Sequence, residues 1–207
     1  MMNGRRTNRM KRSVLLAMMA ISGLLLSACG SGPAPRPNLA IYDLGSVEPL
    51  AGNPNIVASI DVHAPSWLDS RAMQYRLATE PSRRQNFTES RWAATPTELL
   101  AVALRRQLGA AGGVGCALRV DLDEWVQVFD GAGQSRVQLA LQVALRSGRS
   151  DSLIERRSFN LEQAAGSDAR QGVAAFVLQE KQLATGLDVW LKSVAREQKD
   201  LAARCRA

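Results

Sequence analysis

Apolar and polar residues alternate along most of the chain after residue 38, which is the pattern of half-buried β-strands. Four short alternations come first and three longer ones follow. They predict strands at Ala40–Leu44, Ile56–Val62, Met73–Leu77, Gln85–Glu89, Leu118–Val128, Val137–Leu145 and Leu153–Leu161. Turn residues at Asp130–Gly133 and Ser147–Gly148 separate the last three strands, which are therefore expected to form an antiparallel meander with one buried face.

Two segments change to helical spacing. Thr95-Pro96-Thr97-Glu98 is a capping box with proline at the first helical position, and apolar residues then recur by threes and fours from Leu99 to Leu108. A second apolar stripe runs from about Ser167 to Ala203. This order of elements predicts an α+β domain, in which an antiparallel sheet carries two helices packed on one face.

The first 28 residues have the layout of a signal peptide. Five basic residues precede Ser13, and an uncharged run rich in Leu, Ala and Met extends to Ala28. The sequence Leu-Ser-Ala-Cys that ends at Cys29 resembles the bacterial lipobox, so Cys29 is the predicted lipidation site. The alternative is an uncleaved N-terminal anchor, although 16 uncharged residues fall short of the ~20 that a spanning helix needs.

These features divide the chain into a signal peptide (1–28), a Pro-rich tether (29–38) and a folded domain (39–207). The whole chain has 26 basic and 19 acidic residues, a balance that is common in nucleic-acid-binding proteins. Removing the five basic residues of the signal peptide leaves 21 basic against 19 acidic residues. So small an excess excludes nucleic acid as a partner.

Cys116 and Cys205 remain once Cys29 is assigned to lipid. In an oxidising compartment an even number of cysteines favours a disulfide between them, and the alternative is two unpaired thiols. A metal site is not expected, because the single histidine, His63, has no Cys or His near it in the sequence. No cofactor is predicted.

The sequence contains none of the catalytic motifs that we sought. It has no Gly-x-Ser-x-Gly elbow, no His-Glu-x-x-His and no Gly-Lys-Ser/Thr, so we do not expect an enzyme. Asp121 and Asp123 are expected on the outer face of the long strand Leu118–Val128. Glu124 then points toward the apolar face or marks a β-bulge.

Aromatic residues of the same strand raise a second question. Uninterrupted alternation places Trp125 and Phe129 on the face opposite the aliphatic residues of Leu118–Val128. Large apolar side chains on an open face usually mark a contact. That face is covered either by another chain or by the Pro65–Ser70 loop, whereas Trp190 is expected in the core.

A series of short motifs follows the tether in a fixed order. They are Tyr42-Asp43-Leu44, Ala64-Pro65-Ser66-Trp67-Leu68-Asp69-Ser70, Met73-Gln74-Tyr75-Arg76, Ser90-Arg91-Trp92-Ala93, Pro96-Thr97-Glu98-Leu99-Leu100, Asp121-Leu122-Asp123-Glu124-Trp125-Val126-Gln127-Val128-Phe129 and Trp190-Leu191. Taken together, they resemble the auxiliary lipoproteins of ABC-type transport systems, the PqiC-like group. The resemblance covers nearly all of the chain after Cys29.

The resemblance implies a lipid-anchored periplasmic subunit without enzymatic activity. It would work with MCE-domain proteins and with ABC or other inner-membrane transport subunits that move lipids or hydrophobic compounds between membranes. Ring-like self-association is also implied. Gly30 follows Cys29 where an aspartate would retain the protein at the inner membrane, so we expect the periplasmic face of the outer membrane of a Gram-negative bacterium.

Partner contacts are expected where aromatic and polar residues adjoin in the loop and strand motifs. The candidates are Trp67, Leu68, Asp69, Arg91 and Trp92. The alternative function is a periplasmic lipid-binding protein or a stand-alone lipoprotein that maintains envelope integrity.

Overall fold

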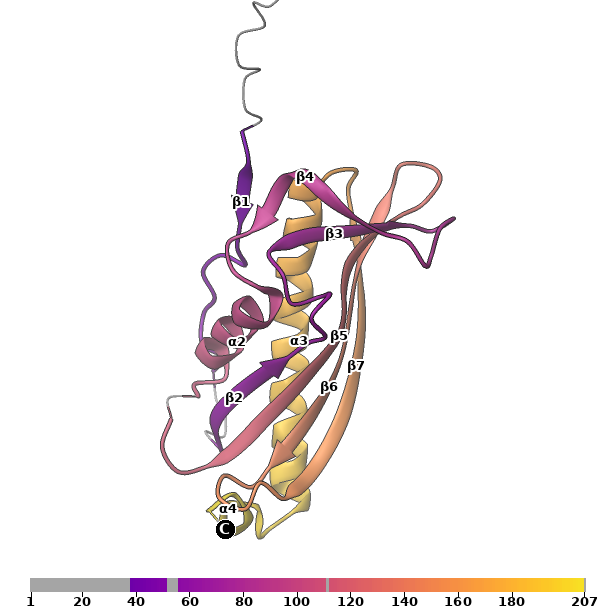
Figure 1. Cartoon of the computed structure of the whole chain (residues 1–207). Coiled ribbons are helices and arrows are strands. Elements are labelled where there is room, and N and C mark those ends of the chain that lie inside the picture. The colour runs from indigo at the N-terminus through magenta and orange to yellow at the C-terminus, as the bar shows by residue number, and fades with distance from the viewer. Residues whose placement is uncertain (1–37, 52–55, 111, 207) are drawn as a thin grey trace, which may run out of the picture. The chain divides into compact units, whose positions relative to one another are not determined.

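The computed structural model describes residues 38–51, 56–110 and 112–206 (Figure 1). The predicted signal peptide and lipidation site, and the tether up to residue 37, lie outside the described residues. Residues 39–207 form one compact unit. Its elements are β1 (Ala40–Tyr42), β2 (Val57–His63), β3 (Ala72–Leu77), β4 (Arg84–Trp92), α2 (Pro96–Gln107), β5 (Cys116–Phe129), β6 (Ser135–Arg146), β7 (Leu153–Ala165), α3 (Ala169–Glu197) and α4 (Leu201–Arg206).

The seven strands of the described chain form one sheet in the order β1-β4-β3-β5-β6-β7, with β2 paired to β5. The predicted α+β class is confirmed, and β5, β6 and β7 form the antiparallel meander. The sheet as a whole is mixed, because β1 runs parallel to β4, and β2 and β3 both run parallel to β5. Alternation shows which residues face the core but carries no information on strand direction.

A β-bulge in β5 exchanges the two faces of that strand. Leu122 pairs with Leu141 and Glu124 with Ala140, so Asp123 is the extra residue. Beyond the bulge, Trp125 pairs with Leu139 and therefore lies on the helix-facing side of the sheet, where it is 3% exposed. The prediction that Trp125 and Phe129 lie opposite the aliphatic face is wrong, because it assumed an uninterrupted alternation.

Both aromatic residues of β5 contact other rings on the helix-facing side. Trp125 stacks on Phe176 of α3, with ring centroids 5.0 Å apart, and meets Trp92 edge-on at 5.7 Å. Phe129 instead lies in a half-buried cluster with Tyr75 and Phe87. The residues that the bulge turns to the opposite face are Glu124, Val126 and Val128, and both valines are buried.

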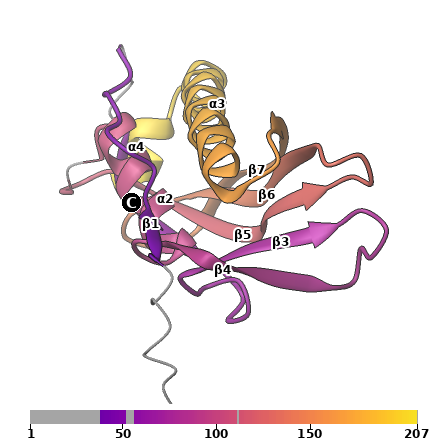
Figure 2. The ribbon, with the colours of Figure 1, turned by 90° about the horizontal axis from the view of Figure 1, so that it is seen from above.

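Helices α2 and α3 cover the same side of the sheet (Figure 2). The predicted capping box begins α2: Thr95 accepts a hydrogen bond from the Glu98 amide, and Glu98 accepts one from the Thr95 amide. The α3 stripe is buried as its spacing requires, including Trp190 at 4% exposure. The predicted single C-terminal helix is interrupted after Glu197, and α4 follows as a separate turn.

A disulfide attaches α4 to the sheet. Cys205 of α4 is bonded to Cys116 at the start of β5, across 89 residues of sequence. Both cysteines are buried in the core cluster, together with Leu201. The C-terminus of the folded unit is therefore held covalently.

Helices α2 and α3 meet through a buried polar pair. The Gln107 side chain of α2 donates a 3.0 Å hydrogen bond from Nε2 to Glu180 Oε2 of α3. Glu180 is 1% exposed, and burial raises the pKa of its carboxyl to about 7, opposed by the Gln107 hydrogen bond and the nearby Lys181 charge. The folded protein consequently releases this proton at a higher pH than the unfolded chain does.

Candidate partner-binding site

Trp67 is an exposed aromatic residue that its neighbours hold in place. Its side chain belongs to the loop between β2 and β3 and is 47% exposed. The Arg84 guanidinium of β4 lies 4.1 Å from the ring centroid, within the range of a cation–π contact. Gln74 of β3 donates a 2.9 Å hydrogen bond to the Trp67 carbonyl. The Gln74 bond restrains the Trp67 backbone and the Arg84 contact restrains the ring, so less conformational entropy is left to lose on binding.

Arg84 is itself held by Glu124, the residue next to the β5 bulge. Glu124 Oε1 and Oε2 both lie 2.8 Å from Arg84 Nη2, and Oε2 also accepts a 2.9 Å hydrogen bond from Arg76. The three side chains are between 19 and 24% exposed, so water screens their attraction only in part. Sequence analysis missed the two arginines. It offered a bulge at Glu124 as one of two alternatives, and that alternative was correct.

The remaining loop candidates have different environments. Leu68 is 2% exposed and belongs to the core. Asp69 is exposed, and its Oδ1 accepts a 2.5 Å hydrogen bond from the Thr97 hydroxyl at the start of α2. Leu68 thus anchors the loop and Asp69 ties it to α2, which leaves Trp67 as the exposed apolar group of the three candidates.

Arg91 and Trp92 lie at the end of β4, where it pairs with β1. Trp92 is 1% exposed and packs against Trp125 and Phe176, so it supports the core and is not accessible to a partner. Arg91 is half-buried and pairs in register with Ile41, which is 53% exposed. The structure therefore brings together Trp67 with Arg84, Arg76 and Glu124, and separates Trp92 from this surface.

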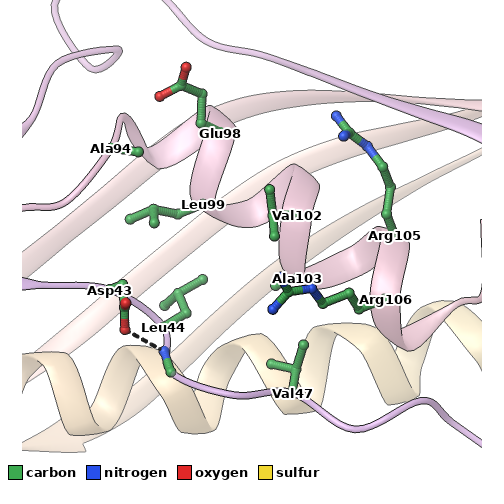
Figure 3. Close-up of a pocket in the computed structure, with 11 residues that line it drawn as sticks. Asp43, Leu44, Val47, Ala94, Glu98, Leu99, Val102, Ala103, Arg105 and Arg106 are labelled. Atoms are coloured by element: carbon green, nitrogen blue, oxygen red, sulfur yellow. Dashed lines mark hydrogen bonds between the residues drawn. The ribbon is translucent and has the colours of Figure 1, made fainter.

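A groove lies elsewhere, between α2 and the segment that follows β1 (Figure 3). Its volume is about 620 Å³. Apolar residues line most of it: Leu44, Val47, Ala94, Leu99, Val102 and Ala103. Asp43, Glu98, Arg105 and Arg106 supply its charges, and Asp43 Oδ1 accepts a 2.8 Å hydrogen bond from the Gly45 amide.

The described residues contain neither a metal-binding cluster nor a membrane-spanning helix. Across 38–51, 56–110 and 112–206, no three His, Cys, Asp or Glu side chains gather closely enough to hold a metal ion. His63 is the exposed last residue of β2. Within the same ranges no helix combines the length and apolar character needed to span a membrane.

Comparison with known proteins identifies the fold. No model of a known protein family matches the sequence, and no curated protein is similar enough to count as a match. A crystal structure of a Xanthomonas campestris protein carrying the family label DUF330 superposes with a TM-score of 0.64 at 19% identity, over 76% of this chain and 97% of that chain. A second crystal structure, of an uncharacterized protein, gives a TM-score of 0.54 at 17% identity, over 74% and 99%.

Proposed function

We propose that this chain is a lipid-anchored accessory subunit of an intermembrane transport system. In this role it is attached through Cys29 to the periplasmic face of the outer membrane. It binds an MCE-domain protein or another transport subunit, and the system moves lipids or other hydrophobic compounds. The protein contributes association, not catalysis.

Two independent observations support the proposal. The ordered motifs from Tyr42 to Leu191 resemble the PqiC-like lipoproteins. The solved structure with the fold described above carries the label DUF330, the family to which the PqiC-like proteins belong. The fold likeness covers 97% of that protein and 76% of this chain.

The observation that carries the association is the Trp67 surface, defined as Trp67, Arg84, Arg76 and Glu124. Tryptophan and arginine are the residues most enriched among binding hot spots. An exposed tryptophan that nothing fixes would lose conformational entropy on binding, whereas Trp67 is already held by Arg84 and Gln74. We therefore assign the partner contact to this surface.

The experiment is co-purification from detergent-solubilised envelopes with wild type, Trp67→Ala and a matched control, Leu178→Ala. Leu178 of α3 is 48% exposed, so both variants remove a similarly exposed apolar side chain. We expect Trp67→Ala to reduce recovery of the MCE-domain protein about tenfold or more, as for a hot-spot residue. Leu178→Ala should leave recovery unchanged.

A further arm separates the contact from the anchor. Cys29→Ala removes the predicted lipidation site, so recovery of the partner from the outer-membrane fraction should fall although the Trp67 surface is intact. Equal recovery with wild type and Trp67→Ala would contradict the assignment of the contact. Absence of any transport subunit from the wild-type sample, at good expression, would contradict the proposed function itself.

A further inference from the structure

The groove of Figure 3 has the composition of a site for a small amphipathic molecule. Leu44 and Ala103 form buried parts of its wall, whereas Leu99 and Val47 are half-buried and Val102 is 44% exposed. Small-molecule sites are typically concave, mainly apolar and about 300–1,000 Å³ in volume, with a few polar groups that fix orientation. The 620 Å³ groove lies within that range.

Its charges are separated along the groove. The Arg106 side chain extends across the groove toward the segment of Leu44 and Val47, whereas Asp43 and Glu98 lie toward the other end (Figure 3). Within the part of the chain that the structure describes, Arg106 makes no ion pair or side-chain hydrogen bond, and neither does Arg105 beside it. A free guanidinium beside an apolar surface matches a ligand that joins an anion to a hydrocarbon chain.

We propose that this groove binds a long-chain fatty acid. The carboxylate accepts two parallel hydrogen bonds from the Arg106 guanidinium, and the acyl chain lies along Val47, Leu99 and Val102. Asp43 and Glu98 repel a carboxylate at their end, so the ligand has one orientation. The assignment goes beyond the proposed function, because it concerns a different surface and a direct ligand and requires no partner protein.

Charge and size together favour a single-chain lipid over a protein segment. One guanidinium reaches over the groove, which suits one carboxylate, and Arg105 at the rim adds attraction without a second defined contact (Figure 3). Apolar side chains, among them Leu44, Leu99 and Val102, make up most of the lining. An acyl chain requires only the apolar lining.

The test is photocrosslinking of the mature lipidated protein, reconstituted in phosphatidylcholine vesicles, with palmitate that carries a diazirine near its methyl end. The protein's own lipid anchor has no diazirine and therefore forms no crosslink. Mass spectrometry then identifies adducts on peptides that span 43–47 and 94–106. We compare wild type with Arg106→Gln and Val102→Asp. Matched controls are Arg196→Gln, an exposed arginine of α3, and Val189→Asp, a 57% exposed valine of α3.

We expect adducts on the groove peptides of the wild type and of both controls. Arg106→Gln should reduce their yield about tenfold, the loss of charge-assisted hydrogen bonds, and Val102→Asp should reduce it at least as much. The diazirine alcohol of the same chain length should label the wild type as weakly as palmitate labels Arg106→Gln. Equal thermal midpoints of Arg106→Gln and Arg196→Gln exclude misfolding as the cause.

Adducts spread evenly over the surface, or adducts in the groove that Arg106→Gln leaves unchanged, would overturn the proposal. A benzophenone amino acid at position 102 that crosslinks to a second copy of the protein and not to the fatty acid would also overturn it. Because the vesicles contain no transport subunit, these outcomes are independent of the Trp67 surface. A failed co-purification would likewise not affect the crosslinking result or its interpretation.

Discussion

Glu180 makes a quantitative prediction about the pH dependence of stability. The carboxyl is buried between α2 and α3, and its pKa is raised to about 7 from an ordinary value of 4.5. The folded state therefore holds a proton that the unfolded state has already released between pH 4.5 and 7. Stability from this group is fully present below pH 4.5 and is lost as pH rises through 7.

The magnitude follows from the pKa difference. The interval from 4.5 to about 7 corresponds to about 3 kcal/mol over the whole titration, most of it between pH 5 and pH 8. Glu180→Gln replaces the carboxyl with a neutral group of the same shape, which still accepts a hydrogen bond from Gln107. This variant should lack the pH dependence that the carboxyl contributes.

The assay is urea denaturation of wild type and Glu180→Gln from pH 5 to pH 8, followed by tryptophan fluorescence. The difference in unfolding free energy should shift by about 2–3 kcal/mol in favour of the variant between these pH values. The control is Glu197→Gln, an exposed glutamate of the same helix, whose difference from wild type should be constant. A constant difference for Glu180→Gln would refute the reasoning, because Glu180 would then ionise in the folded protein without cost.

Three other predictions concern stability and share the urea assay. Gly172→Ala places a methyl group 2.0 Å from Gln127 Oε1, and three hydrogen bonds keep the Gln127 side chain from moving away. The free energy of unfolding should therefore fall by about 1–3 kcal/mol. An unchanged urea midpoint would contradict this prediction. Cys205→Ser should lower the free energy of unfolding by about 2–5 kcal/mol, and a reducing agent should lower that of the wild type by the same amount. A smaller effect of the reductant would mean that the serine itself disrupts packing. Thr95→Ala should cost about 1 kcal/mol through loss of the α2 cap, whereas Thr95→Ser should retain it.

Periodicity predicted the fold class and most of its elements because the buried faces are regular. β6 places Val137, Leu139 and Leu141 inward without interruption, and α3 buries its apolar stripe from Val173 to Val194. The same reasoning failed where regularity breaks. One extra residue, Asp123, turned Trp125 into the core, and nothing in the local pattern distinguished that bulge from an inward Glu124.

The candidate site was less predictable, because it depends on pairings between distant segments. Trp67 could be proposed from its place in a polar loop, but Arg84 and Glu124 reach it only through the β3–β4 hairpin and the bulge. Trp92 was proposed as accessible although it is buried, since a tryptophan at a strand end carries no sign of which side is covered. The groove at Arg106 gave no sequence signal, because α2 alone does not show which segment lies opposite it.

The disulfide makes the two ends of the domain unequal in their resistance to a pulling force. Residues 116 to 205 form a covalently closed loop, so a pulling force cannot unravel β5, β6, β7 or α3 from the C-terminal end. At the opposite end, the first element is β1, which is attached to β4 by only three paired residues. Tension applied through the N-terminal segment would therefore peel β1 from β4 first. The domain would lengthen at that point, whereas the disulfide would carry the force past the closed loop of residues 116–205.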